Sequence, residues 1–251
     1  MSSFAALTAS GYRAQVRDKA ALFFTFAFPL LFLVVFGLIF SGQSVEETGQ
    51  LYITYIAPGV MSWGVANAAV FGMAFTLMQW RRDDLLRLIR MTPTSLPTVL
   101  ASRYVLALAV GAVQALVFTT VAMLPMFGME LGARWPLALP VLVLGITSLL
   151  TIGVVIGSYA DTPEAVAAIA NSLMVPMAFM SGSFLPLDML PAWMQTLSRA
   201  LPLRYFNDAA SAALVGRRDL DEITIGCAGL VVFALVFGMI GLKTFRWSNR
   251  S

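Results

Sequence analysis

The sequence contains no histidine and one cysteine, Cys227, which lies inside an apolar run. Its carboxylates do not gather into clusters. Because histidine, cysteine and grouped carboxylates are the protein ligands of zinc, iron and copper, their scarcity excludes a metalloenzyme, and we expect neither a metal nor a catalytic residue. One cysteine cannot close a disulfide within the chain, so cysteine usage does not report the redox compartment.

Charge is also scarce: Asp, Glu, Lys and Arg make up 12% of the 251 residues, whereas the apolar set AVILMFWYC makes up 59%. A soluble domain contains about 25% charged residues, so most of this chain must face lipid. The sequence pI near 9.3 therefore needs no nucleic-acid partner to explain it. Six long runs contain no charged residue, namely residues 20–41, 51–78, 104–127, 137–159, 165–187 and 223–242.

Each of these runs is long enough for a helix to cross a hydrocarbon core of about 30 Å, which takes about 20 apolar residues. The sequence predicts an all-α membrane protein with six transmembrane helices. Residues 1–251 are expected to form a single membrane domain, because no repeat or linker divides them. Pro58, near the start of the second run, predicts a kink or a broken start there.

The uncharged runs also limit the chemistry. Ionisable residues inside a membrane mark proton relays and ion paths, and these runs hold none, which argues against a proton-coupled carrier and an intramembrane protease. A P-loop requires Gly-x-x-x-x-Gly-Lys-Ser/Thr to cradle phosphates. Only Lys243 precedes a threonine, and Leu242 stands where the motif needs glycine. We therefore expect that the chain is no enzyme by itself and does not hydrolyse nucleotide.

The basic residues indicate the orientation. Cytoplasmic loops are enriched in Lys and Arg, and one set of loops and ends carries eleven of them against five in the other. Both termini are therefore expected in the cytoplasm. A bacterial plasma (inner) membrane is compatible with the absence of an organelle-targeting presequence. The eleven are Arg13, Arg17, Lys19, Arg81, Arg82, Arg87, Arg90, Arg103, Lys243, Arg246 and Arg250; the five are Arg134, Arg199, Arg204, Arg217 and Arg218.

Short helices are expected outside the spans. Residues 3–19 predict an amphipathic helix in the headgroup plane, or else a solvated tail. In the inner loop, Asp83 is expected to cap a short helix that has Asp84 in its first turn and stops at Pro93. Leu85, Leu88 and Ile89 would share one face, suited either to a groove on a soluble partner or to the lipid surface.

The longer segment between spans five and six predicts two more short helices. Prolines 186, 191 and 202 divide it, and residues 192–201 and about 205–215 show helical patterns, the second ending at Gly216. Both are too short and too polar to span, so we expect them to lie at or dip into the outer interface. At the inner turn 160–164, either Asp161 or Thr162 is expected to cap span five.

The order of these features resembles the type-2 permease subunits of ATP-binding cassette exporters, a group that includes daunorubicin-resistance-type drug exporters and polysaccharide exporters. The resemblance covers almost the whole chain. One departure is that Leu85 follows Asp84, where the family often has glycine. The similar segments are Arg17-Asp18 before a Phe-rich first span with Pro29 and Phe36-Gly37, residues 55–59 (Tyr-Ile-Ala-Pro-Gly), the acidic-to-Thr92-Pro93 loop, residues 181–186 (Ser-Gly-Ser-Phe-Leu-Pro) with 190–193 (Leu-Pro-Ala-Trp), and residues 201–205 (Leu-Pro-Leu-Arg-Tyr).

The resemblance implies a coupling helix that passes motion from a separate ATPase to the spans. It implies two ATPase subunits, which hold ATP and Mg²⁺, and a second permease chain, either identical or a sister chain; this chain itself would bind no cofactor. Its other partner would be membrane lipid. The implied coupling helix consists of Arg82, Asp83, Asp84, Leu85, Leu86, Arg87, Leu88, Ile89 and Arg90.

The resemblance also implies a translocation path along spans two and five, and re-entrant helices that close its outer end. For the path residues the alternative is ordinary helix packing. The implied path residues are Ser62, Asn67, Asn171, Ser172, Met174, Met177 and Phe179; the implied gate residues are Pro191, Trp193, Met194, Leu197, Pro202, Tyr205 and Phe206.

Three functions are compatible with this sequence. The first is export of a hydrophobic or amphipathic molecule, drug-like or lipid. The second is export of a polysaccharide or lipid-linked glycan, and the Met content of span five leans away from the stacking aromatics that sugars favour. The third is a membrane scaffold subunit that transports nothing.

Overall fold

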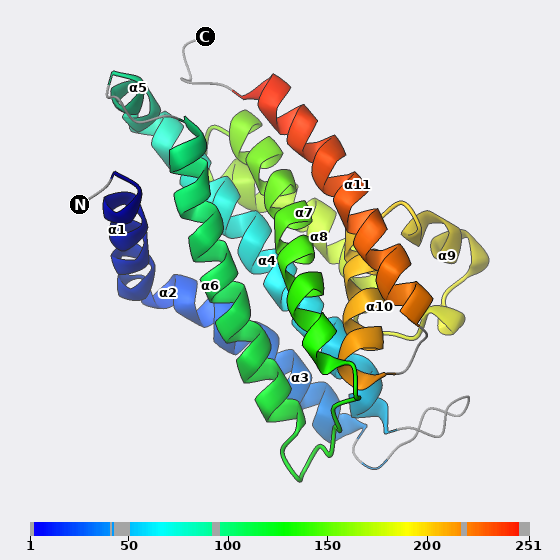
Figure 1. Cartoon of the computed structure of the whole chain (residues 1–251). Helices are drawn as coiled ribbons and strands as arrows, with labels where there is room; N and C mark the ends of the chain where they lie inside the picture. The colour runs from blue at the N-terminus through cyan, green and yellow to red at the C-terminus, as the bar shows by residue number, and fades with distance from the viewer. Residues whose placement is uncertain (1–2, 41, 43–50, 92–95, 217–219, 246–251) are drawn as a thin grey trace.

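The computed structural model describes residues 3–40, 42, 51–91, 96–216 and 220–245, and the regular elements in these ranges are helical. Figure 1 labels the larger of them. In chain order they are α1 Ser3–Arg17, α2 Lys19–Leu22, η1 Phe23–Ala27, α3 Phe28–Ile39, α4 Tyr52–Arg82, α5 Leu85–Arg90, α6 Leu96–Ala122, η2 Trp135–Leu137, α7 Ala138–Tyr159, α8 Pro163–Met180, η3 Leu187–Met189, α9 Ala192–Ser198, α10 Pro202–Val215 and α11 Leu220–Thr244.

Within the described ranges, six helical segments are long and apolar enough to cross a membrane, which confirms the predicted number of spans. Several of these helices continue past the apolar runs, so that charged residues lie at their ends. The segments are Lys19–Ile39, Tyr52–Arg82, Thr98–Ala122, Trp135–Tyr159, Pro163–Met180 and Leu220–Thr244.

Two helices, α6 and α8, end five or more residues before their apolar runs do. The third run continues to residue 127, but α6 ends at Ala122, because Pro125 disfavours helical backbone just before it. The fifth run continues to residue 187, but α8 ends at Met180, and Gly182 then takes a positive φ of 78°. Hydropathy alone does not register such a break. In α4, by contrast, the helix is continuous from Tyr52 through Pro58.

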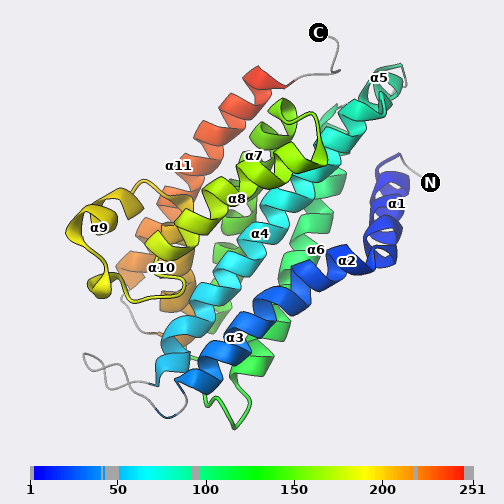
Figure 2. The same cartoon turned by 180° about the vertical axis from the view of Figure 1, so that it is seen from behind.

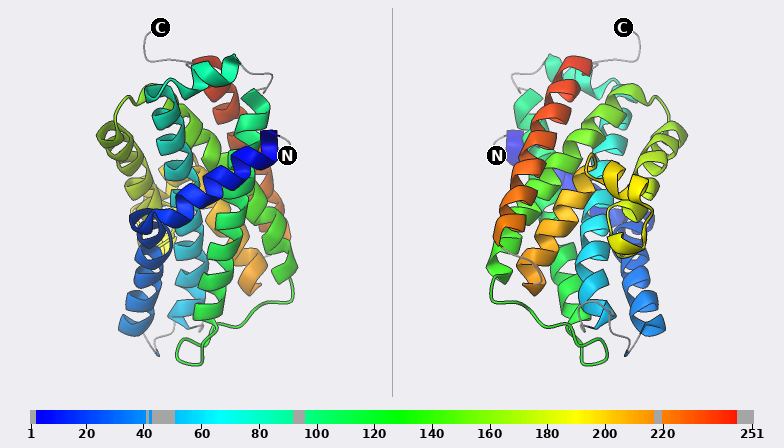
Figure 3. Two further views of the ribbon diagram at one scale, coloured as in Figure 1. Left: turned by 90° about the vertical axis from the view of Figure 1, so that its left-hand side faces the viewer. Right: turned by 90° about the vertical axis from the view of Figure 1, so that its right-hand side faces the viewer.

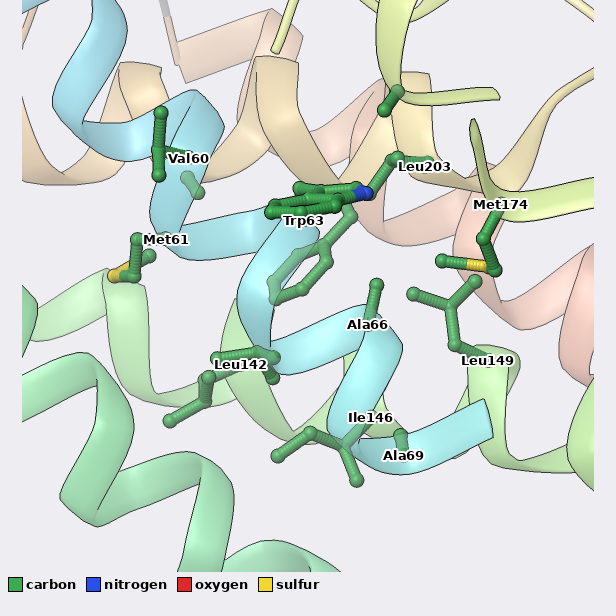
Figure 4. Close-up of a cluster of buried hydrophobic side chains, with 14 of the residues drawn as sticks. Val60, Met61, Trp63, Ala66, Ala69, Leu142, Ile146, Leu149, Met174 and Leu203 are labelled. Atoms are coloured by element: carbon green, nitrogen blue, oxygen red, sulfur yellow. The ribbon is translucent and has the colours of Figure 1, made fainter. Parts of the chain in front are cut away.

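The centre of the bundle is α4, which packs against α3, α6, α7, α8 and α10. Figure 1 shows α6 and α7 in front of it, and Figure 2, from behind, shows it between α3 and α8. Figure 4 shows part of the core around Trp63, with Ile146 and Leu149 from α7 and Met174 from α8. Close packing of such side chains holds the helices of the chain together.

The backbones of α7 and α4 approach each other closely at Gly153 and Gly157 of α7. A Cβ atom on Gly153 would lie 2.6 Å from the carbonyl oxygen of Val70, and one on Gly157 would lie 2.7 Å from that of Ala74. Only glycine permits this approach, so the Gly-x-x-x-Gly pair fixes α7 directly on the backbone of α4.

The two ends of the bundle differ. The start of α1, the short helix α5 and the C-terminal end of α11 lie at the same end (Figures 1 and 3). Helix α1 packs on α6, where the side chains of Leu106 and Arg103 leave no room for a Cβ atom on Gly11. Helix α9 projects from the side of the bundle (Figures 1 and 2), whereas α10 packs among α4, α7 and α11.

Candidate functional site

The inner-loop helix α5 begins after a sharp turn at Asp83 and Asp84. Asp83 is the C-terminal cap of α4: its backbone N–H donates to the carbonyl of Gln79, and its carboxylate accepts from the Gln79 side chain at 2.8 Å. Asp84 has a φ of 52°, and α5 starts only at Leu85. The prediction that Asp83 caps α5 with Asp84 in its first turn is wrong, because Asp83 ends the preceding helix.

The two faces of α5 are set by leucines. Leu86 is fully buried in a cluster with Leu77, Trp80 and Val99, and Leu85 packs against the edge of this cluster. Leu88 is 56% exposed. The expected stripe of Leu85 and Leu88 is therefore divided between the bundle and the outside. Arg82, Asp83 and Asp84 are exposed, and the side chains of Arg87, Ile89 and Arg90 lie outside those described.

At the same end, Arg81 in the last turn of α4 is almost wholly buried. Its guanidinium group pairs with Asp161 at 3.0 Å. Of the two residues expected to cap α8, Thr162 does so, with its hydroxyl accepting the N–H of Ala165 at 3.2 Å. Sequence reasoning treated Arg81 only as a topology charge. The sequence offered one signal for this ion pair: Arg81 lies four positions before α5, and an acidic residue stands in the turn 160–164.

The residues expected to line a path fall into two groups. Ser62, Met174 and Met177 are buried within the core of this chain. Asn171, Ser172 and Phe179 are exposed on one side of α8, and Asn67 of α4 is half-buried, with its side chain donating to the carbonyl of Trp63 at 2.8 Å. Their role stays a prediction, although only the second group is accessible from outside the protomer.

The connection after α8 is held by side chains that sequence reasoning did not single out. The hydroxyl of Tyr52 donates to the carbonyl of Phe184 at 3.1 Å, and that of Tyr55 donates to the carbonyl of Gly182 at 3.2 Å. Asn207 of α10 donates to the carbonyl of Ser181 at 3.1 Å. The residues 181–184 are therefore fixed between α4 and α10.

The residues expected in outer gate helices lie on α9 and α10. Both helices form, although α9 ends at Ser198 rather than at 201 and α10 begins at Pro202 rather than near 205, and Gly216 ends α10 with a φ of 62°. Tyr205 donates to the carbonyl of Arg199 at 2.8 Å, which links α10 to the end of α9. Their position relative to a membrane stays a prediction. Pro191, Trp193 and Leu197 are exposed, Met194 and Tyr205 are half-buried, and Pro202 and Phe206 are buried.

A bundle of six apolar helices with a short helix between its second and third spans defines a multi-pass membrane protein. The sequence profile of the family described as ABC-2 type transporter matches residues 2–215. The chain therefore belongs to the ABC-2 type transporter family, which confirms the resemblance seen in its sequence. Helix α11 lies beyond the matched residues.

Individual relatives are permeases. The chain is 27% identical over 238 residues to the daunorubicin resistance ABC transporter permease protein DrrB1 of Streptomyces coeruleorubidus, covering 88% of this chain and 78% of that protein. It is 21% identical over 210 residues to the inner membrane transport permease YadH of Escherichia coli K12, covering 84% and 81%. A shorter match, 29% over 118 residues, joins 46% of this chain to 31% of the linearmycin resistance permease protein LnrN of Bacillus subtilis.

Proposed function

We propose that this chain is the permease subunit of an exporter driven by a separate ATPase, and that α5 is the helix on which the ATPase acts. The observation that carries the proposal is the division of α5 into a buried and an exposed face. Leu86 anchors it in the bundle, while Leu88 and the charged residues before α5 face outward. A short helix that is held firmly on one side, with an exposed leucine and neighbouring charges on the other, is suited to a groove on a soluble subunit.

The proposed location of the chain is the plasma (inner) membrane of a bacterial cell, with α5 and both termini in the cytoplasm. Basic residues support this, because those near α1, α5 and the end of α11 outnumber those at the opposite end. The start of α1, α5 and the end of α11 also lie at one end of the bundle (Figure 3). In this orientation α1 lies near the inner headgroups and α9 and α10 near the outer side.

The proposed assembly contains two ATPase subunits and two permease chains, with the path where the permeases meet. Support comes from α8, whose residues Asn171, Ser172 and Phe179 are exposed although they belong to a membrane-spanning helix. Polar side chains facing lipid are costly, so a second chain is the more favourable neighbour. Met174 and Met177 pack inside this chain, which supports a structural contribution for them.

The proposed substrate class is a hydrophobic or amphipathic molecule, drug-like or lipid. The accessible residues of α8 that support it are apolar or uncharged, including Val175 and Phe179. Such a surface offers no partner for a highly charged solute. Two of the permeases similar to this chain carry names that refer to resistance to daunorubicin and linearmycin.

The test is affinity purification of the chain from its native membranes in mild detergent, followed by assay of vanadate-sensitive ATP hydrolysis. The wild-type chain should bring down a P-loop subunit and its activity. Leu88→Glu should reduce both by about tenfold or more, since a charge in an apolar interface costs more than the ~1.4 kcal/mol that corresponds to tenfold. Leu220→Glu, an equally exposed leucine on α11, is the matched control.

Two outcomes would contradict the proposal. If the wild-type chain is recovered without any ATPase, it is a scaffold rather than a transport subunit. If Leu88→Glu retains full ATPase while the protein inserts normally, α5 is not the docking helix.

A further inference from the structure

Arg81 occupies the last turn of α4, directly before the turn that leads into α5. Its side chain is only 1% exposed, and it is among the largest fully buried side chains of the described residues. Burying a guanidinium group is costly unless it is both paired and hydrogen-bonded. Its partners therefore define what the group does.

Among the described residues, the hydrogen-bond partners of Arg81 belong to one segment, the end of α7 and the turn into α8. Nη1 donates to the carbonyl oxygens of Gly157 at 3.0 Å and Ala160 at 3.2 Å, and Nη2 donates to the carboxylate of Asp161 at 3.0 Å. Carbonyls at a helix C-terminus lack partners in their own helix and carry partial negative charge. Arg81 thus caps α7 from the neighbouring helix.

The contact made by Arg81 borders the tightly packed helices α4 and α7, and it leads directly into the next span, α8. Gly153 and Gly157 hold α7 against the backbone of α4, so the two helices cannot slide freely past each other. Asp161 is followed at once by Thr162, which caps α8. Arg81 therefore joins α4, the helix that leads into α5, to the turn directly before α8, in addition to the direct packing of α4 on α8.

We propose that Arg81 is a positioning residue that passes the displacement of α5 to the start of α8. The inference rests on the proposed function of α5 and on α8 as a wall of the path. The chain of contacts runs from α5 through the end of α4, through Arg81, to the turn at Ala160 and Asp161, and so into α8. The ion pair also offsets the cost of burying the guanidinium group, so a structural role and a coupling role are told apart by measuring movement rather than stability.

The geometry requires arginine. Two guanidinium nitrogens reach three acceptors, whereas a lysine ammonium is a single point of charge on a flexible chain. Arg81→Lys therefore keeps the positive charge and loses the planar guanidinium group that reaches three acceptors. Asp161→Asn keeps the size of the acceptor and loses its charge. Both changes weaken the contact of Arg81 with the turn at Ala160 and Asp161, which we call the joint, and leave α5 in place.

The experiment measures distances between spin labels in the assembled permease–ATPase complex, first without nucleotide and then trapped with ATP and vanadate. In a Cys227→Ser background, labels at Gln79 and Ala101 report movement of α4 against α6, and labels at Glu164 and Ala101 report movement of α8. In the wild type both distances should change on trapping. In Arg81→Lys and Asp161→Asn the change in the Gln79–Ala101 distance should persist. The change in the Glu164–Ala101 distance should fall to less than about half of its wild-type value.

Arg13→Lys and Asp221→Asn, at exposed positions away from the joint, should leave both distance changes as in the wild type. A full α8 change in both joint variants, or an α4 change without an α8 change in the wild type, overturns the proposal. If neither distance changes in the wild type, it is the coupling role of α5 that fails. If Arg81→Lys does not assemble, the α8 distance change in Asp161→Asn alone is the test, because the Asp161 side chain is mostly exposed and its replacement is compatible with folding.

Discussion

At the scale of single residues, the tightest constraints lie where a backbone meets a backbone. Gly157 illustrates this, because its missing side chain leaves room for the carbonyl of Ala74 in α4. A Gly-x-x-x-Gly pair in a sequence permits such an approach but does not say which helix makes it. The structure supplies the partner.

Gly157→Ala should destabilise the protein by about 1–3 kcal/mol, because the added methyl group would overlap the Ala74 carbonyl oxygen and force α7 away from α4. Thermal unfolding in detergent should show a lower Tm. Gly72→Ala is the matched control. It lies in the same bundle with nothing within 4 Å of its Cβ position, and alanine there should be neutral or stabilising by up to about 1 kcal/mol. Equal Tm values for the two variants would refute the close contact.

The sequence predicted helix-ending and helix-capping residues correctly at some positions, but it did not predict which distant residues contact each other. Gly216 and Thr162 act as the helix-ending and helix-capping residues that local propensity favours. Asp83, in contrast, ends the preceding helix, and in the described part of the chain its carboxylate accepts from the Gln79 side chain and not from a backbone N–H of α5. Arg81 shows the limit most clearly, because its acceptors are distant in the sequence and only the fold brings them together.

At the scale of elements, the connection from α8 to α9 is fixed mainly by hydroxyl groups of α4. Tyr55 donates to the carbonyls of Gly182 and Leu185, and Tyr52 donates to that of Phe184. The ring of Phe184 also lies 5.0 Å from that of Trp63, measured between centroids. The segment is therefore held by polar and aromatic contacts together.

Replacing Tyr52 and Tyr55 together by Phe should loosen this connection while leaving its aromatic contacts. Each lost hydrogen bond contributes about 1 kcal/mol, so amide exchange across residues 181–187 should rise by about tenfold or more. Hydrogen exchange followed by mass spectrometry measures this. Tyr12→Phe, at an exposed tyrosine of α1, should leave the exchange unchanged. Unaltered exchange in the double variant would show that the hydroxyls do not hold the loop.

Helix α5 shows how far an element can be predicted. Its existence and approximate extent followed from the acidic start, the leucines and the downstream proline. Its buried face did not, because Leu86 points into a pocket made by residues of α4 and α6. Periodicity finds an apolar side, but tertiary contacts choose which leucine is covered.

At the scale of the whole molecule, the number of spans was predictable because the bilayer thickness sets a minimum length for an apolar helix. The arrangement of those spans was not. Nothing in hydropathy places α4 at the centre or inserts α10 among α4, α7 and α11. Among the residues predicted to line a path, the exposed ones could not be separated from the packed ones by sequence, since Met174 and Phe179 are both large and apolar but differ in burial.

The proposed orientation makes a prediction about the two ends. In a Cys227→Ser background, a cysteine at Asp221 should react with a membrane-impermeant maleimide in intact cells, and a cysteine at Ser10 should react only after lysis. Both positions are exposed in the protein, so accessibility depends on the side of the membrane. The reverse pattern would show that the chain is inserted the other way round.

The buried pair of Arg81 also has a consequence for how the protein is made. Its acceptors at Gly157, Ala160 and Asp161 follow it by 76, 79 and 80 residues. At a synthesis rate of about 5–20 residues per second, roughly 4–16 s pass before the ribosome has added them. Until then the guanidinium must remain in water or among headgroups, so α4 enters the lipid unpaired, and the joining of α4 to α7 is a late step in biogenesis.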